Sequence, residues 1–287
     1  MATMFFGQYL LAKAVINREA LLDALDRQRR SNLSLPELAL QQGLIDRRRA
    51  NSIMVQYRMS DAPIEIILEQ SGGLSAEQIQ RLQNKQRSSW LRIGAALVEG
   101  GHLSDEEIAS HLADYRSLES AVDQEIREAM RHVPDSDAVS ACVELTVFHL
   151  ARVTGRPVKL KSVSVEADTL AADRQRFSQR IVGDGDYTIV VDLPPALVAE
   201  VARGMLGFSV EPGAEAEPDA VCEVINLIGG NACTRIEQLG QLLRPEPPSW
   251  SGSGDLVTAA EPAVRAVVAS ADMEFEIWVF SAGDSVK

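Results

Sequence analysis

The chain contains little cysteine and little histidine. Its three cysteines are an odd number and include no Cys-x-x-Cys pair: Cys142, Cys222 and Cys233. Neither a disulfide framework nor a cysteine-based zinc site is therefore expected. The four histidines also lack metal-ligand spacing, and we expect each at the surface or at a helix cap: His102, His111, His132 and His149. This residue usage fits a reducing cytoplasm and predicts no metal ion or cofactor bound by the chain itself.

Long apolar runs are missing as well. Nowhere do eighteen apolar residues follow one another, so no membrane-spanning helix is expected. The apolar residues at 4–11 are not preceded by a basic segment, and Lys13, Arg18 and Glu19 soon interrupt them, which does not fit a signal peptide. We therefore expect a soluble, cytoplasmic protein.

Basic residues are scarce relative to acidic ones. The chain has 28 Lys and Arg against 41 Asp and Glu, which gives a formal net charge of −13. An acidic surface repels nucleic acids and anionic membranes, so neither is an expected partner. Two motifs of common enzyme classes are also absent, the Gly-x-Ser-x-Gly nucleophile turn and the phosphate-binding glycine loop. The 287 residues, 46% of them apolar, are enough for two globular domains.

An internal repeat occupies the first 120 residues. Candidate helix caps recur every 29 residues at Asn17, Asp46, Ser75 and Ser104. Other slots keep the same step, including a glutamine or tyrosine eleven residues after each cap: Gln28, Tyr57, Gln86 and Tyr115. Each unit predicts a short helix, a tight turn and a capped second helix of about three turns. One such unit cannot bury its apolar side alone, so the four are expected to stack or to pair in an all-α domain, residues 1–120.

The fourth unit carries a family resemblance. Residues 92–103, Arg-Ile-Gly-Ala-Ala-Leu-Val-Glu-Gly-Gly-His-Leu, resemble the repeated motif of MshEN domains, the N-terminal domains of type II secretion and pilus ATPases. In that family an arginine opens each motif, and some members bind cyclic-di-GMP. Arg92 is the only arginine in that slot here; the other units have Phe5, Ser34 and Pro63. Two interpretations stay open, a degenerate repeat used for packing or protein contact and a cyclic-di-GMP sensor.

A second domain is predicted after a linker. Residues 121–136 lose the 29-residue register and are expected to form a polar helical connector that ends near Pro134. In the domain at 137–287, periodic patterns predict three helices (138–153, 196–205 and 219–240) and five strands (158–165, 177–182, 187–193, 264–268 and 274–280). The residues Gly183-Asp184-Gly185-Asp186 predict a hairpin turn. The element order predicts an α+β fold, a layer sandwich in which helices cover an antiparallel sheet.

The predicted helix at 219–240 has one buried stripe. Apolar residues recur at three- and four-residue steps from Val221 to Leu239. Asp219 is the expected cap at its start, and Gly240 is suited to end it in the left-handed conformation.

The opposite face of this helix has an unusual composition. Glu223 and Asn226 are three residues apart and are therefore neighbours on the helix surface. Gly229 and Gly230 follow one turn later, although each glycine costs about 1 kcal/mol relative to alanine inside a helix. Something must therefore approach this backbone closely, either a neighbour within the domain or a partner outside it.

Glu223-x-x-Asn226 followed by Leu-Ile-Gly-Gly-Asn, residues 227–231, resembles the signature helix of the CheX/CheC/FliY family of chemotaxis phosphatases. The order of elements over roughly residues 135–283 is similar to that family too. The resemblance implies that the helix docks on a phosphorylated CheY-like receiver and that the chain hydrolyses its aspartyl phosphate. It further implies that Asn226 orients the attacking water, that Glu223 forms an ion pair with a receiver lysine, and that magnesium belongs to the receiver.

The family pattern also bears on the number of active faces. CheC-type members carry Glu-x-x-Asn on both long helices, whereas residues 144–147 here are Glu-Leu-Thr-Val and lack the asparagine. One active face is therefore expected, as in CheX-like members, and a homodimer through sheet edges, as in some relatives, stays open. Glu223 has no histidine or second acid within one turn, so a general-base pair has no support. The competing hypothesis is a non-catalytic adaptor whose domains only bind proteins or a dinucleotide.

Overall fold

The computed structural model describes residues 5–60, 62–166, 174–208, 214–251, 263–270 and 273–281. The contacts divide the chain into two compact units with a boundary between Ser120 and Ala121. We refer to them as the N-terminal and the C-terminal unit. None of the helices in the described ranges is both long enough and apolar enough to cross a membrane.

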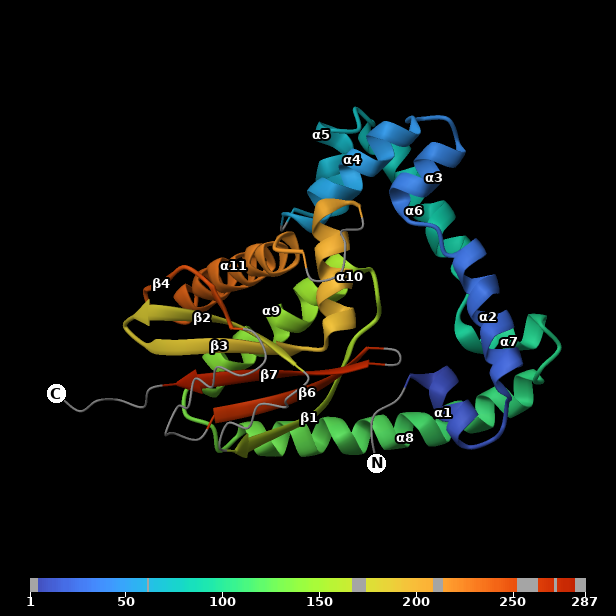
Figure 1. Ribbon diagram of the computed structural model, residues 1–287. Coiled ribbons are helices and arrows are strands. Elements are labelled where there is room, and N and C mark those ends of the chain that lie inside the picture. The colour runs from blue at the N-terminus through green and yellow to red at the C-terminus, as the bar shows by residue number, and fades with distance from the viewer. Residues whose placement is uncertain are drawn as a thin grey trace. The chain divides into compact units, whose positions relative to one another are not determined.

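In the described residues of the N-terminal unit, all regular secondary structure is helical (Figure 1). Four short helices begin at 29-residue steps: α1 (Phe6–Ala12), α3 (Leu35–Gln41), α5 (Ile64–Gln70) and α7 (Ile93–Glu99). Four longer helices alternate with them at the same step: α2 (Arg18–Ser31), α4 (Arg47–Arg58), α6 (Ala76–Ser89) and α8 (Asp105–Met130). Each predicted cap accepts a hydrogen bond from the backbone N–H three residues on, so these side chains act as caps: Asn17, Asp46, Ser75 and Ser104.

Two hydrophobic cores hold the N-terminal unit together. One core joins the first and last helices through Leu10, Leu97 and other residues, and the other joins α3 to α6 through Leu38 and Leu82. Pairing in this way removes from water the apolar side that one helical pair leaves exposed. Two glutamines in equivalent slots add one hydrogen bond beside each core. Gln28 Nε2 donates to the Leu91 carbonyl beside the first core, and Gln86 Nε2 donates to the Leu33 carbonyl beside the second, both at 2.9 Å.

The last long helix is longer than its repeat predicts. The pattern suggests about three turns, but α8 has 26 residues and contains the first part of the predicted polar connector. It ends before Pro134. Asp135, in the left-handed conformation with φ +50°, is the residue before α9 (Ser136–Thr154), which begins two residues earlier than the helix predicted at 138–153.

The described residues of the C-terminal unit contain an antiparallel seven-stranded sheet with the order β1-β6-β7-β3-β2-β4, and β5 also pairs with β2. The strands are β1 (Lys159–Glu166), β2 (Gln175–Gly183), β3 (Asp186–Leu193), β4 (Leu243–Pro245), β5 (Ser249–Ser251), β6 (Ala263–Ser270) and β7 (Met273–Ser281). Strands β2 and β3 form the hairpin that the glycine-rich residues 183–186 predict. The fold of this unit is thus mixed helix and antiparallel sheet.

Strands β4 and β5 correct the sequence analysis. Residues 245–254 are rich in proline, serine and glycine and predict no strand, yet both short strands pair with β2. Pro245 lacks a backbone N–H, which counts against a central strand but is tolerated in a short strand at the edge of a sheet. Residues 252–254 lie outside the described ranges.

In the part of this unit that the structure describes, three helices cover one face of the sheet: α9, α10 (Pro195–Leu206) and α11 (Ala216–Glu237) (Figure 1). Alternate residues of the strands point toward them and are fully buried, for example Phe177, Ile181, Ile189, Val191, Phe275 and Ile277. From the helices, Val139, Leu150, Val198, Val221 and Ile228 complete this core. The core fixes which face of each helix is left for solvent.

Cross-strand ion pairs lie on the other face of the sheet. Arg176 on β2 and Asp192 on β3 are register partners and form two hydrogen bonds of 2.8 and 2.7 Å while only 1% and 2% exposed. Removing one member leaves the other charge buried, so Asp192→Ala is expected to cost about 3–5 kcal/mol of unfolding free energy. Asp186→Ala breaks an exposed pair with Arg180 and should cost far less because water screens it. Urea unfolding measures both, and equal losses would contradict the assignment.

Candidate functional site

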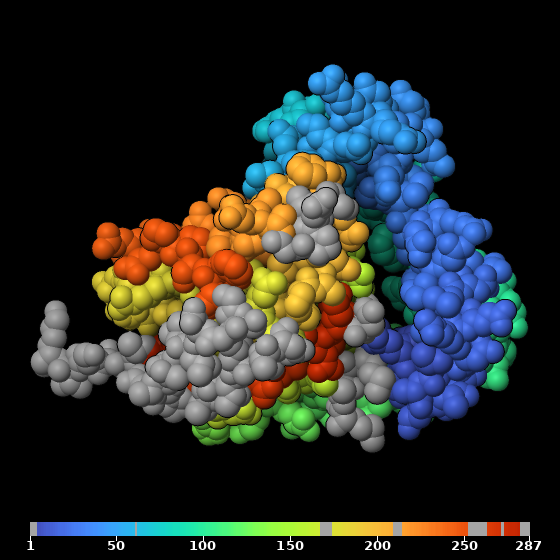
Figure 2. All heavy atoms as spheres, viewed as in Figure 1, coloured from blue at the N-terminus to red at the C-terminus, as the bar shows by residue number. Residues whose placement is uncertain are grey.

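Helix α11 places Glu223 and Asn226 together at the surface. Both side chains are exposed, whereas Val224, Ile225 and Ile228 have no exposed surface and anchor the helix on the sheet. Atoms of α11, orange in Figure 2, are visible on the surface of the C-terminal unit. The carboxylate and the carboxamide are therefore accessible to a partner.

The ends of α11 differ slightly from those predicted. The helix starts at Ala216, so Asp219 lies within the helix instead of capping it. Pro218 stands in the first turn, where its missing N–H removes no helical hydrogen bond. At the other end the helix stops at Glu237 and Gly240 turns the chain with φ +96°, which leaves Leu239 52% exposed and outside the buried stripe.

Gln179 on β2 lies beneath Asn226, and the sequence analysis does not single it out. The side chain is 1% exposed, and its Nε2 donates to the Glu246 carbonyl at 2.7 Å and to Asn226 Oδ1 at 3.1 Å. A backbone carbonyl only accepts hydrogen bonds, so the group that faces Glu246 must be the amide nitrogen. Asn226 therefore turns its oxygen toward Gln179. Its Nδ2 hydrogens and the second lone pair of Oδ1 stay available for a ligand.

The two adjacent glycines of α11 have different surroundings. A Cβ atom on Gly229 would lie 2.0 Å from Gln179 Oε1, so this glycine makes room for the buried glutamine. Apart from its own neighbours in α11, a Cβ atom on Gly230 would meet no described atom within 4 Å. The neighbour expected within the domain is thus found at Gly229, while Gly230 leaves bare backbone near Asn226.

These surroundings predict opposite effects of alanine at the two glycines. Gly230→Ala should raise the unfolding free energy by about 1 kcal/mol, because alanine is the better helix former and has open space. Gly229→Ala gains the same propensity but must displace Gln179 and break two hydrogen bonds worth about 1 kcal/mol each. Thermal unfolding should therefore rank Gly230→Ala above wild type and Gly229→Ala clearly below Gly230→Ala. Equal melting temperatures of the two variants would contradict the assigned contacts.

Helix α9 contacts the second half of α11. Asn231 Nδ2 lies 3.0 Å from Nε2 of His149, and Arg235 pairs with Glu144 at 2.8 Å. His149 is 1% exposed, so the expectation of a surface or capping role is wrong for this histidine. The sequence signal for its burial is its position at helical spacing on the buried face of α9. Asn231 therefore joins the two helices and does not extend the Glu223–Asn226 surface.

The cysteines offer no nucleophile near this surface. Burial raises the pKa of Cys142 to about 12. Burial also raises the pKa of Cys222, and the negative charges of Asp219 and Glu223 add to this effect. Both thiols stay protonated near neutral pH, and the thiolate is the reactive form. Among the described residues, no group of three His, Cys, Asp or Glu side chains is arranged to hold a metal ion.

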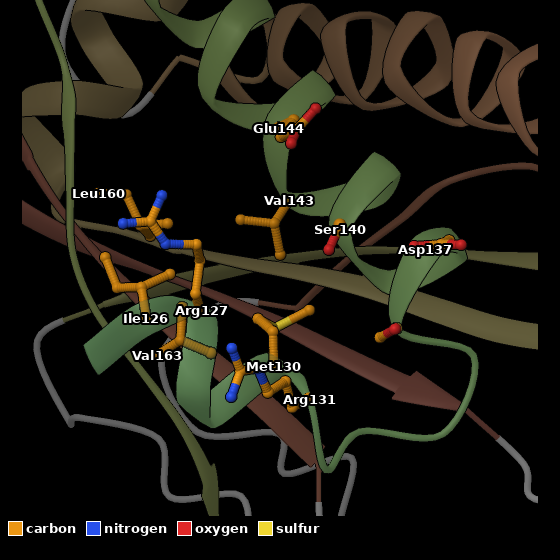
Figure 3. A pocket seen from close by; sticks show the side chains of 11 residues that line it. Ile126, Arg127, Met130, Arg131, Asp137, Ser140, Val143, Glu144, Leu160 and Val163 are labelled. Carbon is orange, nitrogen blue, oxygen red and sulfur yellow. The ribbon is translucent and has the colours of Figure 1, made fainter. Parts of the chain in front are cut away.

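A hollow of about 400 Å³ lies elsewhere in the C-terminal unit (Figure 3). Apolar side chains from the end of α8, from α9 and from β1 line it, among them Ile126, Met130, Val143, Leu160 and Val163. Arg127, Arg131, Asp137 and Glu144 supply charges of both signs. Neither Glu223 nor Asn226 contributes to the lining, so this hollow is distinct from the candidate site.

In the N-terminal unit, the slot that holds Arg92 is the same structural position in every repeat. Phe5, Ser34, Pro63 and Arg92 are the residues that precede the four short helices. A hollow of about 310 Å³ is lined by Arg92, Arg87, Gln86 and Trp90, and Trp90 is 55% exposed. Among the described residues in this slot, Arg92 of the fourth repeat is the one cation, and it lines the same hollow as an exposed aromatic ring.

Comparisons with known proteins match part of the chain. The model of the CheC-like family matches residues 217–251, which include Glu223 and Asn226. No curated protein matches the chain. Solved structures with similarity include a chemotaxis protein CheX from Desulfovibrio desulfuricans, with 21% identity over 50% of this chain and 99% of that one, TM-score 0.46. A CheC-like superfamily protein from Shewanella sp. PV-4 has 19% identity over 52% and 100%, TM-score 0.47. A CheX-CheY-BeF3-Mg complex from Borrelia burgdorferi has 14% identity over 50% and 96%, TM-score 0.42.

Proposed function

We propose that the C-terminal unit binds a phosphorylated CheY-like receiver and hydrolyses its aspartyl phosphate. The observation that carries this proposal is the exposed pair of Glu223 and Asn226 on α11, with the carboxamide held from below and bare backbone at Gly230 one turn away. The match of the CheC-like family over residues 217–251 supports it, because the matched segment contains both side chains.

The reaction requires a positioned water more than a strong base. The water oxygen forms a bond to phosphorus while the bond between phosphorus and the aspartyl oxygen breaks. An acyl phosphate dianion and water thus give the aspartate carboxylate and dihydrogen phosphate, which retains both protons of the water. Positioning and charge stabilisation supply most of the catalysis in phosphoryl transfer. Asn226 can accept a hydrogen bond from the water through Oδ1 and can donate through Nδ2, without being ionised itself.

Glu223 has the role of fixing the docked position. Its carboxylate is exposed three residues before Asn226, and among the described residues no hydrogen bond or ion pair occupies it. A lysine of the receiver would form a charge-assisted hydrogen bond there and set the register of the two proteins. We place the magnesium ion that neutralises the phosphoryl oxygens on the receiver, which supplies its own carboxylates.

The test is phosphate release from candidate receivers. A panel of CheY-like receivers from the same genome is phosphorylated with acetyl phosphate, and steady-state phosphate release is measured with and without the protein. We expect a rate that rises with receiver concentration and saturates for at least one receiver. Rates equal to those of the receivers alone across the panel would reject the proposal.

A second candidate function is that of an adaptor that binds a receiver without catalysis or binds cyclic-di-GMP through the N-terminal unit. The hollow lined by Trp90, Arg87 and Arg92 favours it, because a guanine base can stack on an exposed indole while arginines meet the phosphates. Calorimetry with cyclic-di-GMP tests this alternative. Binding heat that disappears in Arg92→Ala would support it, and the absence of heat at high micromolar protein would exclude the dinucleotide.

A further inference from the structure

We infer that Gln179 is a positioning residue that fixes which end of the Asn226 carboxamide faces a bound ligand. The inference rests on the proposed function for its effect on catalysis, whereas the orientation of Asn226 can be tested without it. Gln179 comes from β2 and is only 1% exposed, so it acts through Asn226 and does not touch a partner itself.

An exposed asparagine has no inherent preference for which end of its carboxamide, the oxygen or the nitrogen, faces a given neighbour. The last torsion of the side chain is broad and roughly two-fold, so oxygen and nitrogen exchange places at little cost. The hydrogen bond from Gln179 Nε2 to Asn226 Oδ1, 3.1 Å long, removes this equivalence. Rotation of Asn226 by half a turn would bring its Nδ2 against Gln179 Nε2, two donors without an acceptor between them.

Gln179 can impose this orientation because its own amide is fixed on two sides. Nε2 donates to the Glu246 carbonyl at 2.7 Å, and the Glu246 N–H in turn donates to the Arg180 carbonyl of β2 at 2.8 Å. On the other side Gly229 leaves just enough space for Oε1, since a Cβ there would lie 2.0 Å away. The glycine and the glutamine are therefore one arrangement, built beneath Asn226.

The oxygen of Gln179 indicates that stability alone does not explain this residue. Oε1 is buried and has no hydrogen-bond partner among the described residues. Buried polar atoms are nearly always paired, and an unpaired one is destabilising. Phe177 and Ile181, which point to the same side of β2, are apolar and fully buried. An apolar side chain at 179 would avoid the unpaired oxygen but would give Asn226 no donor.

Gln179→Met tests the inference because methionine has a similar length and no donor. With a responsive receiver, we expect kcat to fall about 10-fold or more, because a misplaced catalytic group loses rate steeply. KM and the dissociation constant for a receiver loaded with beryllium fluoride and magnesium should stay within about two-fold, since the docking face is unchanged. Gly229→Ala should produce the same split by displacing Gln179 from the opposite side.

A matched control separates positioning from general loosening of the fold. Thr146→Val removes one buried side-chain hydrogen bond, to the Cys142 carbonyl, from α9 of the same unit. It should leave kcat at the wild-type value. Gln179→Met should melt close to the wild-type temperature, because removal of the unpaired buried oxygen offsets the loss of the two hydrogen bonds that Nε2 donates. The inference would be overturned if the loss of kcat simply followed the loss of melting temperature across Gln179→Met, Gly229→Ala and Thr146→Val.

Whether Gln179 holds the Asn226 carboxamide in place is measured from the order of its side-chain amide by ¹⁵N relaxation, with the signal assigned by its loss in Asn226→Ala. We expect an ordered amide in the wild type and a mobile one in Gln179→Met. If the amide is equally mobile in both proteins, the inference is wrong whatever the kinetics show. If the wild type fails to accelerate any receiver but its amide is ordered by Gln179, the proposed function fails and the positioning role stands. If the wild type is active and Gln179→Met has an unchanged kcat, the positioning role of Gln179 is also overturned.

Discussion

Asn226→Ala is expected to lower the rate of receiver dephosphorylation by about 100-fold or more while the affinity for the phosphorylated receiver stays within a few-fold. Alanine removes the acceptor and donors that would orient the attacking water, but it leaves Glu223 and the bare backbone at Gly230 unchanged. Folding should change little, because Asn226 is exposed and the helix propensity gained with alanine offsets the lost hydrogen bond from Gln179.

Single-turnover decay of the phosphorylated receiver measures the chemical step, and titration with the receiver loaded with beryllium fluoride measures binding. Asn84→Ala is the matched control, since Asn84 is an exposed asparagine within α6 of the other unit. In the presence of Asn84→Ala, the receiver should lose its phosphate at the wild-type rate. A wild-type rate in Asn226→Ala would show that this residue has no catalytic role.

Glu223→Lys is expected to raise KM by about 10- to 100-fold with little change in kcat at saturating receiver. The substitution replaces a charge-assisted hydrogen bond, worth about 1.5–3 kcal/mol, with repulsion between like charges. Because Glu223 is exposed to solvent, the proposed ion pair should be screened by salt, so the wild-type KM should also rise with salt, and that dependence should weaken in the variant.

The matched control for this charge reversal is Glu237→Lys at the last residue of α11, which is exposed as well and changes the net charge equally. If both variants shift KM to the same extent, the effect comes from the overall charge of −13 and not from a contact at Glu223. A fall in kcat at unchanged KM would instead assign Glu223 to the chemical step.

The local pattern of the sequence predicts α11 and its exposed pair well, for a physical reason. Helical periodicity requires Val221, Val224 and Ile228 on one side, so Glu223 and Asn226 must lie on another. The helix caps Asn17 and Ser75 are equally local, because a cap bonds only three residues along the chain. Such features need no knowledge of distant contacts.

The contacts between distant segments could not be predicted in the same way. Gln179 occurs in a strand 47 residues before Asn226, and nothing within β2 indicates which helix residue it meets. The sequence marks Gln179 in one way only. It shares the buried side of the strand with Phe177 and Ile181, where a polar side chain is unusual. The glycine pair likewise indicates a close approach but not its source. Only the structure separates Gly229, which faces Gln179, from Gly230, which faces open space.

The most direct test of the account is the decay of a purified, phosphorylated CheY-like receiver mixed with excess protein in a single turnover. The account predicts that the receiver loses its phosphate faster as the protein concentration rises, until a plateau is reached at which every receiver is bound. It also predicts that Asn226→Ala binds the receiver and leaves the decay at the rate of the receiver alone. A decay that is unaffected by saturating wild-type protein, with binding demonstrated in the same sample, would contradict the central claim.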